Sequence, residues 1–154
     1  VSAGADIVQV DEPAILKNKE HRDIFAASLR QLINAKGSAK LALYTYFGDV
    51  AWLFGFLQEL PLDILGIDFT YNRALIPMIA REGSIKPLGL GLIDGRNTKM
   101  DDEKETSRDL DVLLPAIKGE FSYLNPSCGL EYLPRDRALM KLKNMARIAA
   151  RYTS

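Results

Sequence analysis

The sequence predicts an α/β protein with a parallel β-sheet, and two observations carry this prediction. Apolar segments of strand length recur five times, at residues 7–10, 41–44, 64–67, 88–93 and 121–124. Segments with helical periodicity separate them, and this alternation is typical of a parallel sheet. Each apolar segment also ends in polar side chains, so the strands are expected to deliver polar groups to one rim of the sheet.

Two architectures fit this alternation, an open doubly wound sheet and a stretch of a (β/α)8 barrel. In an open sheet, only the strands near the topological switch point need polar ends, because ligands bind there. A barrel brings every strand end to one mouth, and a complete one needs eight strands and about 250 residues. Polar residues at the ends of all five strands favour the barrel, although the pattern alone leaves the open sheet possible.

The first three βα units follow one another without a linker. Their strands are predicted at residues 6–10, 40–46 and 64–69, and their helices at 22–35, between 49 and 61, and at 74–81. Pro13 ends the first strand because proline gives the strand ladder no donor. Apolar periodicity places Ile24, Leu29 and Leu32 on the buried face of the first helix.

The last two units repeat the pattern with a more charged helix between them. Their strands are predicted to begin at residue 88 and to cover 121–124, and their helices lie between 101 and 119 and between 134 and 151. Asp102 is expected to cap the first of these helices, where negative charge suits the helix dipole. The periodicity of the last helix directs Leu139 and Leu142 inward.

Composition limits the classes of function. The chain of 154 residues has 20 basic and 20 acidic residues and no basic block, which argues against nucleic acid as a partner. No apolar run reaches the roughly 18 residues of a membrane-spanning helix. The single cysteine excludes an intrachain disulfide, and a reducing cytoplasm fits. The chain begins without Met and runs almost directly into a strand, so we expect further residues before Val1.

Some residues inside the strands suggest how the sheet packs. Gly89 and Gly91 do not follow the order of a dinucleotide-binding fingerprint, so we interpret them as positions of close approach. Tyr44 and Tyr46 share one face of the second strand and either line a mouth or pack in the core.

Five motifs, in register along nearly the whole chain, resemble cobalamin-independent methionine synthase. They read VQVDEPA at residues 8–14, TYFGD at 45–49, GID at 66–68, LGLIDGRN at 90–97 and NPSCGL at 125–130. The resemblance implies that residues 1–154 are a single domain forming roughly the last five βα units of a (β/α)8 TIM barrel. The second and fourth motifs look more like the zinc-free N-terminal barrel of the family than its catalytic barrel.

This resemblance implies transfer of a methyl group from a methylated folate or similar donor to homocysteine, without cobalamin. In the catalytic barrel, zinc converts the homocysteine thiol into a thiolate. Cys128 matches one family zinc ligand and Asp68 stands near another, but the His-x-Cys pair is missing, so the ligand set is incomplete. An equal alternative for Asp68 is to cap the loop that follows its strand. The alternative is a non-catalytic, zinc-free barrel that binds substrate, or that partners a separate catalytic barrel or another copy of itself.

The resemblance also suggests how individual residues bind substrate. Asp11 matches the residue that holds the amino group of homocysteine, although a strand-end turn with Pro13 is an equal alternative. Tyr46 is expected at the mouth. Asp94, Arg96 and Asn97 form the densest polar cluster, in which Arg96 binds a carboxylate such as the glutamate tail of a folate, or pairs with Asp94. The alternative for Cys128 is a small buried thiol.

Overall fold

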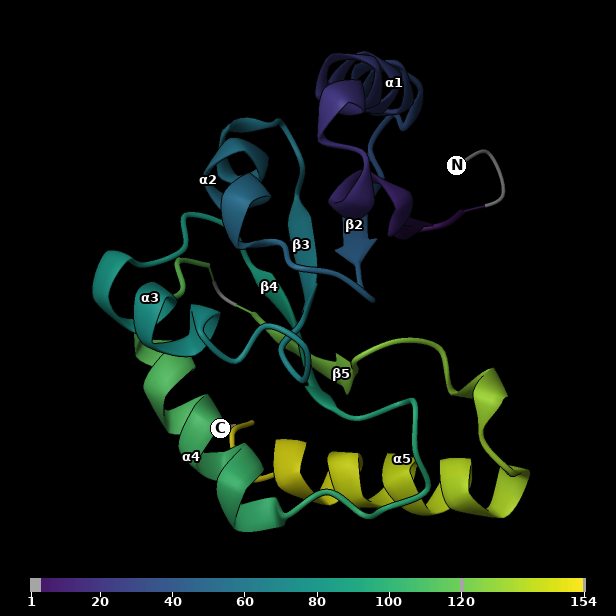
Figure 1. The fold of residues 1–154 in the computed structure, drawn as a ribbon, viewed down its shortest axis with the longest axis vertical. Helices are drawn as coiled ribbons and strands as arrows, with labels where there is room; N and C mark the ends of the chain where they lie inside the picture. The colour runs from purple at the N-terminus through teal and green to yellow at the C-terminus, as the bar shows by residue number, and fades with distance from the viewer. Residues whose placement is uncertain (1–3, 120, 154) are drawn as a thin grey trace.

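The structure is a computed structural model that describes residues 4–119 and 121–153. It contains one sheet of five parallel strands, in the order in which they occur in the sequence (Figure 1). The strands are β1 (Ile7–Asp11), β2 (Lys40–Thr45), β3 (Ile64–Asp68), β4 (Leu88–Ile93) and β5 (Tyr123–Pro126). Sequential order leaves no point at which the strand order reverses, so the described sheet lacks the switch point of a doubly wound fold.

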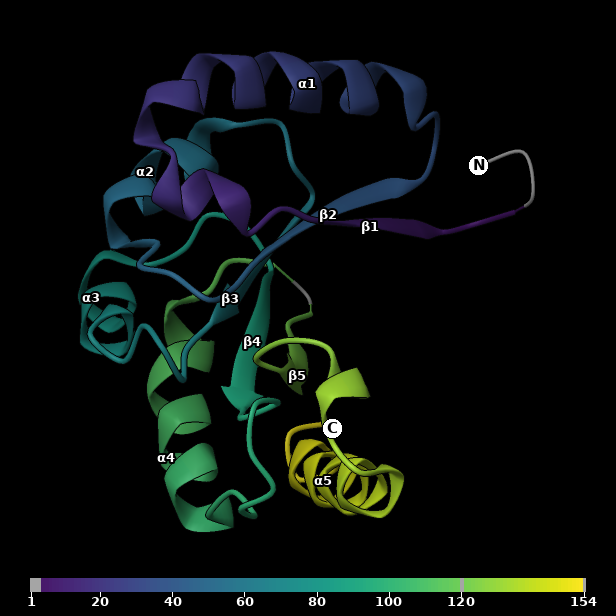
Figure 2. The same ribbon diagram turned by 45° about the vertical axis from the view of Figure 1, so that its right-hand side comes forward.

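The helices surround the outer side of this curved sheet, as Figures 1 and 2 show. They are α1 (Arg22–Ala35), α2 (Ala51–Glu59), α3 (Leu75–Glu82), α4 (Glu103–Leu113) and α5 (Arg135–Ala149). Short 3-10 turns occur at Ala14–Lys17, Lys19–His21, Leu114–Ala116 and Leu130–Tyr132. Within the described residues, no helix combines the length and the apolar character needed to cross a membrane.

The core lies between the sheet and the helices. Leu43, Leu65 and Leu88 are fully buried on the side of the sheet that the helices cover. Leu53 from α2 and Ile79 from α3 are equally buried and belong to the same apolar cluster. Full burial of each such side chain contributes about 1.5–3 kcal/mol, so this layer holds the strands in the arrangement that places their ends.

Most predicted boundaries agree with the structure to within two residues. Residues 22–35 form a helix as predicted, and Asp102 caps α4 by accepting the N–H groups of Lys104 at 2.8 Å and Glu105 at 3.3 Å. The fifth strand starts two residues later than predicted, at Tyr123, and Phe121 is 63% exposed.

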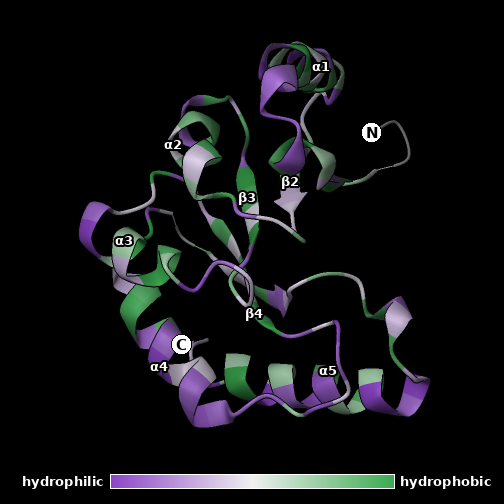
Figure 3. Ribbon diagram, in the orientation of Figure 1, coloured by the Kyte–Doolittle hydropathy of each residue, from purple (hydrophilic) through white to green (hydrophobic). Residues whose placement is uncertain are grey.

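The predicted buried face is wrong in part on α1 and wrong on α5. On α1, Leu29 is buried as predicted, but Ile24 and Leu32 are 68% and 42% exposed, and Phe25, one turn before Leu29, faces the core. On α5, Leu139 and Leu142 are 50% and 42% exposed, while Lys141, Asn144 and Ile148 are buried. Figure 3 shows hydrophobic and hydrophilic residues interleaved along α5. The polar residues are buried there because they find partners in the segment that follows β4, described below.

Candidate functional site at the carboxyl end of the sheet

The two faces of the sheet differ sharply in chemistry. Paired residues of neighbouring parallel strands point to the same side, so the register defines rows across the sheet. One row consists of Asp11, Tyr44, Gly66, Gly89 and Tyr123. The next row toward the carboxyl ends of the strands consists of Asp68, Gly91 and Asn125. This face is therefore made of polar and very small residues, whereas the helix-covered face is aliphatic.

Tyr44 lies across two glycines on this polar face. A Cβ added at Gly66 would lie 2.1 Å from the Tyr44 Cδ1 atom, and one added at Gly89 would lie 2.4 Å from its hydroxyl. At Gly91, an added Cβ would lie 2.5 Å from the Ile67 carbonyl oxygen. The interpretation of Gly89 and Gly91 as close-approach positions is confirmed. The pKa of the half-buried Tyr44 phenol is raised, and burial is the largest cause.

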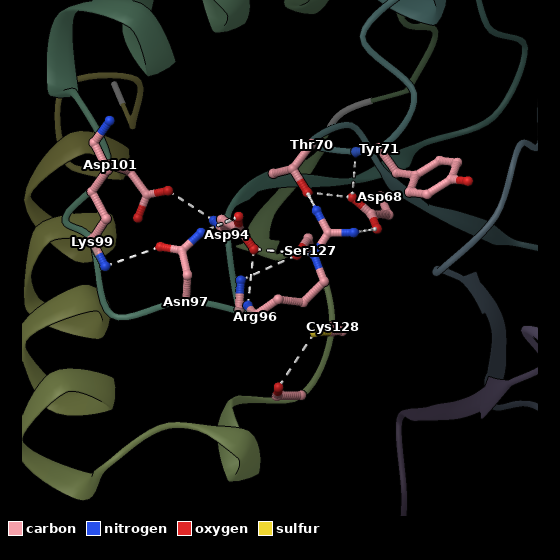
Figure 4. A network of polar contacts seen from close by, with 12 residues as sticks. Asp68, Thr70, Tyr71, Asp94, Arg96, Asn97, Lys99, Asp101, Ser127 and Cys128 are labelled. Atoms are coloured by element: carbon pink, nitrogen blue, oxygen red, sulfur yellow. Dashed lines mark hydrogen bonds and ion pairs between the residues drawn. The ribbon is translucent and has the colours of Figure 1, made fainter.

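Asp68 is the last residue of β3 and organises the rim (Figure 4). Its side chain has no exposed surface. One carboxylate oxygen accepts the Thr70 hydroxyl at 2.6 Å and the Tyr71 N–H at 2.9 Å. The other oxygen faces a guanidinium nitrogen of Arg96 at 3.4 Å. Asp68 thus closes the turn after β3 and connects it to the turn after β4.

Arg96 lies between two carboxylates. Its Nε–H donates to an Asp94 carboxylate oxygen at 3.2 Å, and the same oxygen accepts the Arg96 backbone N–H at 2.9 Å. The guanidinium also donates to the Thr70 hydroxyl oxygen, and the Asn97 amide donates to the second Asp94 oxygen. The internal pairing of Arg96 with Asp94 is therefore formed, and Figure 4 shows the guanidinium between the two strand ends.

The end of β5 joins the same rim through Ser127 and Cys128. The Ser127 hydroxyl accepts the Gly95 N–H at 3.1 Å. Cys128 is 7% exposed, and its thiol donates to the Gly129 carbonyl at 3.5 Å. Burial, the largest cause, raises the pKa of this thiol; the charge of Asp68 adds to the effect, while Ser127 and Arg96 oppose it. Cys128 is therefore a protonated, buried thiol near neutral pH.

Asp11 and Tyr46 occupy the first two strand ends of the rim. Asp11 is exposed and accepts a hydrogen bond from the Gln9 amide at 2.8 Å. Burial raises the pKa of Tyr46, and the negative charge of Asp11 adds to it. Beside Tyr46, the Phe47 ring lies edge-on at 4.8 Å between centroids, and Tyr132 follows at 6.3 Å from Phe47.

An open cleft of about 680 Å³ runs beside the Asp94 cluster, between the turn after β3 and the first turns of α4. Its lining contains five acidic residues, among them Asp94 and Asp101, but only two basic ones, Arg73 and Lys99. Arg73 is already bound to Asp109 at 2.5 Å. Asp94 and Asp101 are likewise paired, with Arg96 and Lys141, so most of the negative charge of this cleft is already balanced.

The donor set at the rim does not fit a zinc ion. Among the residues that the structure describes, no group of three or more His, Cys, Asp or Glu side chains could hold a metal. Both Asp68 oxygens are engaged, and the Arg96 guanidinium supplies the positive charge beside them.

Sequence reasoning missed several residues of this site. Thr70 bridges Asp68 and Arg96, and its position two residues after a strand-end Asp is the usual spacing for a turn that the carboxylate closes. Phe47 has a backbone φ of 63°, which is uncommon for a bulky residue, and nothing in the sequence indicates it. Asp101 lies next to the predicted cap residue Asp102, and nothing in the sequence indicates that its carboxylate accepts the Asp94 N–H at 2.8 Å.

The fold and this rim define a parallel α/β protein with barrel-like curvature and a polar site at the carboxyl ends of its strands. A sequence model described as "Cobalamin-independent synthase, N-terminal domain" matches residues 1–117. The chain belongs to this family, as the motifs at its strand ends predicted.

Individual relatives agree with this assignment. The chain is 33% identical over 149 residues to a methionine synthase of Sulfurisphaera tokodaii, covering 96% of this chain and 43% of that protein. It is 32% identical over 146 residues to a methionine synthase of Saccharolobus islandicus, covering 94% and 44%. The chain thus spans less than half the length of these curated relatives.

A solved structure shares the fold. The B12-independent methionine synthase from a Shewanella species, determined in complex with selenomethionine, superposes with a TM-score of 0.77 at 23% identity. The match covers 97% of this chain and 49% of that one. The five parallel strands and their helices therefore correspond to part of a methionine synthase barrel.

Proposed function

We propose that the carboxyl rim of this chain binds the amino-acid substrate of a methionine synthase system as a zinc-free barrel, while a separate catalytic barrel activates the thiol. The observation that carries the proposal is which charged side chains of the rim are paired and which one is exposed. Arg96 is held by Asp68 and Asp94, whereas Asp11 is exposed and has an amide as its hydrogen-bond partner. An exposed carboxylate beside Tyr46 suits the ammonium group of homocysteine or methionine.

Two further findings support a zinc-free role. The matching sequence model is that of the N-terminal domain of the family. At the position where Asp68 and Cys128 would begin a metal site, the guanidinium of Arg96 provides a fixed cation. In this proposal Asp94 and Asn97 hold Arg96 in place, and the rim orients the amino acid without ionising its thiol.

A second candidate is the complete reaction, methyl transfer from a methylated folate or similar donor to homocysteine. It is favoured by the relatives named methionine synthase, which align with nearly the whole chain. In this candidate, guanidinium N–H groups of Arg96 that are not used in its internal pairs donate to a carboxylate of the folate's glutamate tail, with Asn97 beside it. Cys128 and Asp68 then contribute to a metal site whose other ligands lie elsewhere.

The binding of L-methionine, followed by calorimetry on the intact protein, tests the first candidate. Asp11→Asn removes the charge but keeps the shape, and we expect it to weaken binding by about tenfold or more, the range of a charge-assisted hydrogen bond. Asp6→Asn is the matched control, because it removes the same charge just before β1, at the other end of the strand. Equal affinity of the Asp11→Asn variant and wild type would contradict the assignment of Asp11.

Metal content separates the two candidates. We expect less than one zinc per ten molecules in the purified intact protein, and transferase activity only after a catalytic barrel is added. Stoichiometric zinc together with methyl transfer by the protein alone would establish the second candidate instead.

We also propose that this sheet is the last five units of a (β/α)8 TIM barrel. Within the described residues, β1 and β5 each have a strand neighbour on one side only, and such edges invite further pairing. The exposed Leu139 and Leu142 of α5 would pack against the added units. Amide exchange in the intact protein checks this: the outer-edge amides of β1 and β5 should be protected as strongly as those of β3.

A further inference from the structure

Helix α5 buries a lysine. Lys141 has no exposed surface, although apolar Leu139 and Leu142 on the same helix remain exposed. A buried ammonium group is costly unless it is paired, and a hydrophobic side chain of similar size is commonly at least as stabilising. The position of Lys141 is therefore explained by its partner rather than by packing.

That partner is Asp101, in the segment between β4 and α4. The Lys141 ammonium donates to one Asp101 oxygen at 2.8 Å, and the other oxygen accepts the Asp94 N–H at 2.8 Å. Asn144, one turn further along α5, approaches the Asp101 carbonyl oxygen at 3.4 Å. One carboxylate oxygen of Asp101 thus binds Lys141 of α5, and the other binds the backbone of Asp94, the first residue of the rim cluster.

From Asp94 the connection continues into the site. Its carboxylate fixes the Arg96 backbone and side chain and accepts the Asn97 amide, and Arg96 reaches Asp68. The two ends of the segment 94–101 are therefore joined by the hydrogen bond between Asp94 and Asp101, and Asp101 is bound to Lys141 of α5. Figure 4 shows Asp101 and Asp94 joined on one side of this network.

We propose that Lys141 is a positioning residue: through Asp101, it fixes the backbone of Asp94 and thereby aims the cluster of Asp94, Arg96 and Asn97 at the carboxyl rim. The inference rests on the proposed function, because it assumes that the rim binds substrate. In this proposal Lys141 acts on the cluster through Asp101, to which its ammonium group donates at 2.8 Å.

The test compares Lys141→Met, which keeps the length of the side chain and removes the charge, with Lys141→Arg, which keeps the charge. In the intact, ligand-free protein we expect Lys141→Met to speed amide exchange at Asp94 at least tenfold. We also expect it to weaken L-methionine binding by tenfold or more, and Lys141→Arg to recover most of both. Lys143→Met, an exposed lysine on the same helix, should change neither.

Loss of stability could by itself weaken binding, so a double variant separates the two effects. Lys141→Met with Asp101→Asn leaves no unpaired charge, and its melting temperature should return toward that of wild type while binding stays weak. Recovery of wild-type affinity together with the melting temperature would show that the pair serves stability only, and would overturn the inference. So would wild-type exchange at Asp94 in Lys141→Met. Failure of the wild-type protein to bind L-methionine would instead count against the proposed function, and the Asp94 exchange would still test the positioning.

Discussion

The two ends of β3 each carry an aspartate in an ion pair, yet the two pairs are built differently. At the amino end, Asp63 accepts the backbone N–H of Leu41 at 2.8 Å and faces the Lys36 ammonium at 3.0 Å. At the carboxyl end, Asp68 binds side chains and a turn N–H, and its cation comes from the segment after β4. The first aspartate fastens one strand to the next, whereas the second joins functional side chains to one another.

Burial separates the two ends further. The Asp63 side chain is 36% exposed, and surface pairs of this kind contribute little. The Asp68 side chain has no exposure, so its charge depends on its partners. The carboxyl end thus carries a network of charged side chains around a fully buried aspartate, whereas the amino end carries a partly exposed pair that joins two strands. In (β/α)8 barrels the site lies at the carboxyl end, while the amino end serves stability.

The largest expected effect is at Asp68. Asp68→Ala removes the acceptor of Thr70 and the Tyr71 N–H and leaves Arg96 with Asp94 alone. Breaking a buried pair costs about 3–5 kcal/mol, and because Arg96 can turn toward solvent we expect about 2–3 kcal/mol of lost unfolding free energy. Urea denaturation measures it.

Asp63→Ala is the matched control at the other end of the same strand. We expect it to cost about 1 kcal/mol, the value of one hydrogen bond. Equal losses of unfolding free energy in Asp68→Ala and Asp63→Ala would contradict the proposed difference between the two ends of β3.

Between the two rims, the polar face of the sheet depends on space for Tyr44. Gly66→Ala places a methyl group within 2.1 Å of the Tyr44 ring, and overpacking of this kind costs about 1–3 kcal/mol. Tyr44→Ala in the same chain should restore most of the loss, which a double-mutant cycle by urea denaturation reveals.

The control for Gly66 is Gly55 in α2, where an added Cβ meets nothing within 4 Å. Gly55→Ala should stabilise the protein, by up to about 1 kcal/mol, because alanine is the better helix former. A cost at Gly66 that Tyr44→Ala leaves unchanged would mean that the strain lies in the backbone.

These comparisons also show what the sequence could predict. The five strands follow from apolar runs that stop at polar residues, and α1 follows from periodicity, so the elements and their order were predictable. The buried face of α5 was not, because periodicity counts apolar residues and cannot foresee that Lys141 finds Asp101, 40 positions away.

The site was predictable in outline and not in detail. Parallel strands bring their carboxyl ends together, so strand-end residues such as Asp68, Asp94 and Cys128 could be expected on one rim. Whether Arg96 binds a ligand or pairs with Asp94 depends on the path of the segment after β4. That path is fixed by Asp101, which Lys141 of α5 holds, and by Ser127 after β5, so it depends on residues far along the chain.

The next effect is kinetic and concerns the thiol at the carboxyl rim. Because burial raises the pKa of Cys128, little thiolate exists at pH 7.5, and the side chain is also covered. We expect iodoacetamide to modify the folded protein at least about tenfold more slowly than it modifies the same protein in urea, whose thiol has the ordinary pKa of about 8.5. Mass spectrometry over time measures both rates, and modification of the folded chain as fast as of the unfolded one would rule out the protonated, buried thiol.

The smallest effect is the pH dependence of the amino end. Burial alone would raise the pKa of Asp63, but the Leu41 N–H and then Lys36 outweigh it, so the pKa lies below its ordinary value. A lowered folded pKa means that the carboxylate stabilises the fold above the unfolded pKa of about 3.9, and that this contribution is lost as the pH falls through the folded pKa. Because Asp63 is partly exposed, we expect less than about 1 kcal/mol. Asp63→Asn keeps an acceptor for Leu41 and removes the charge. The difference in unfolding free energy between wild type and this variant should be constant above about pH 5 and shrink toward zero in more acidic solution, and a difference that grows on acidification would reverse the assigned direction.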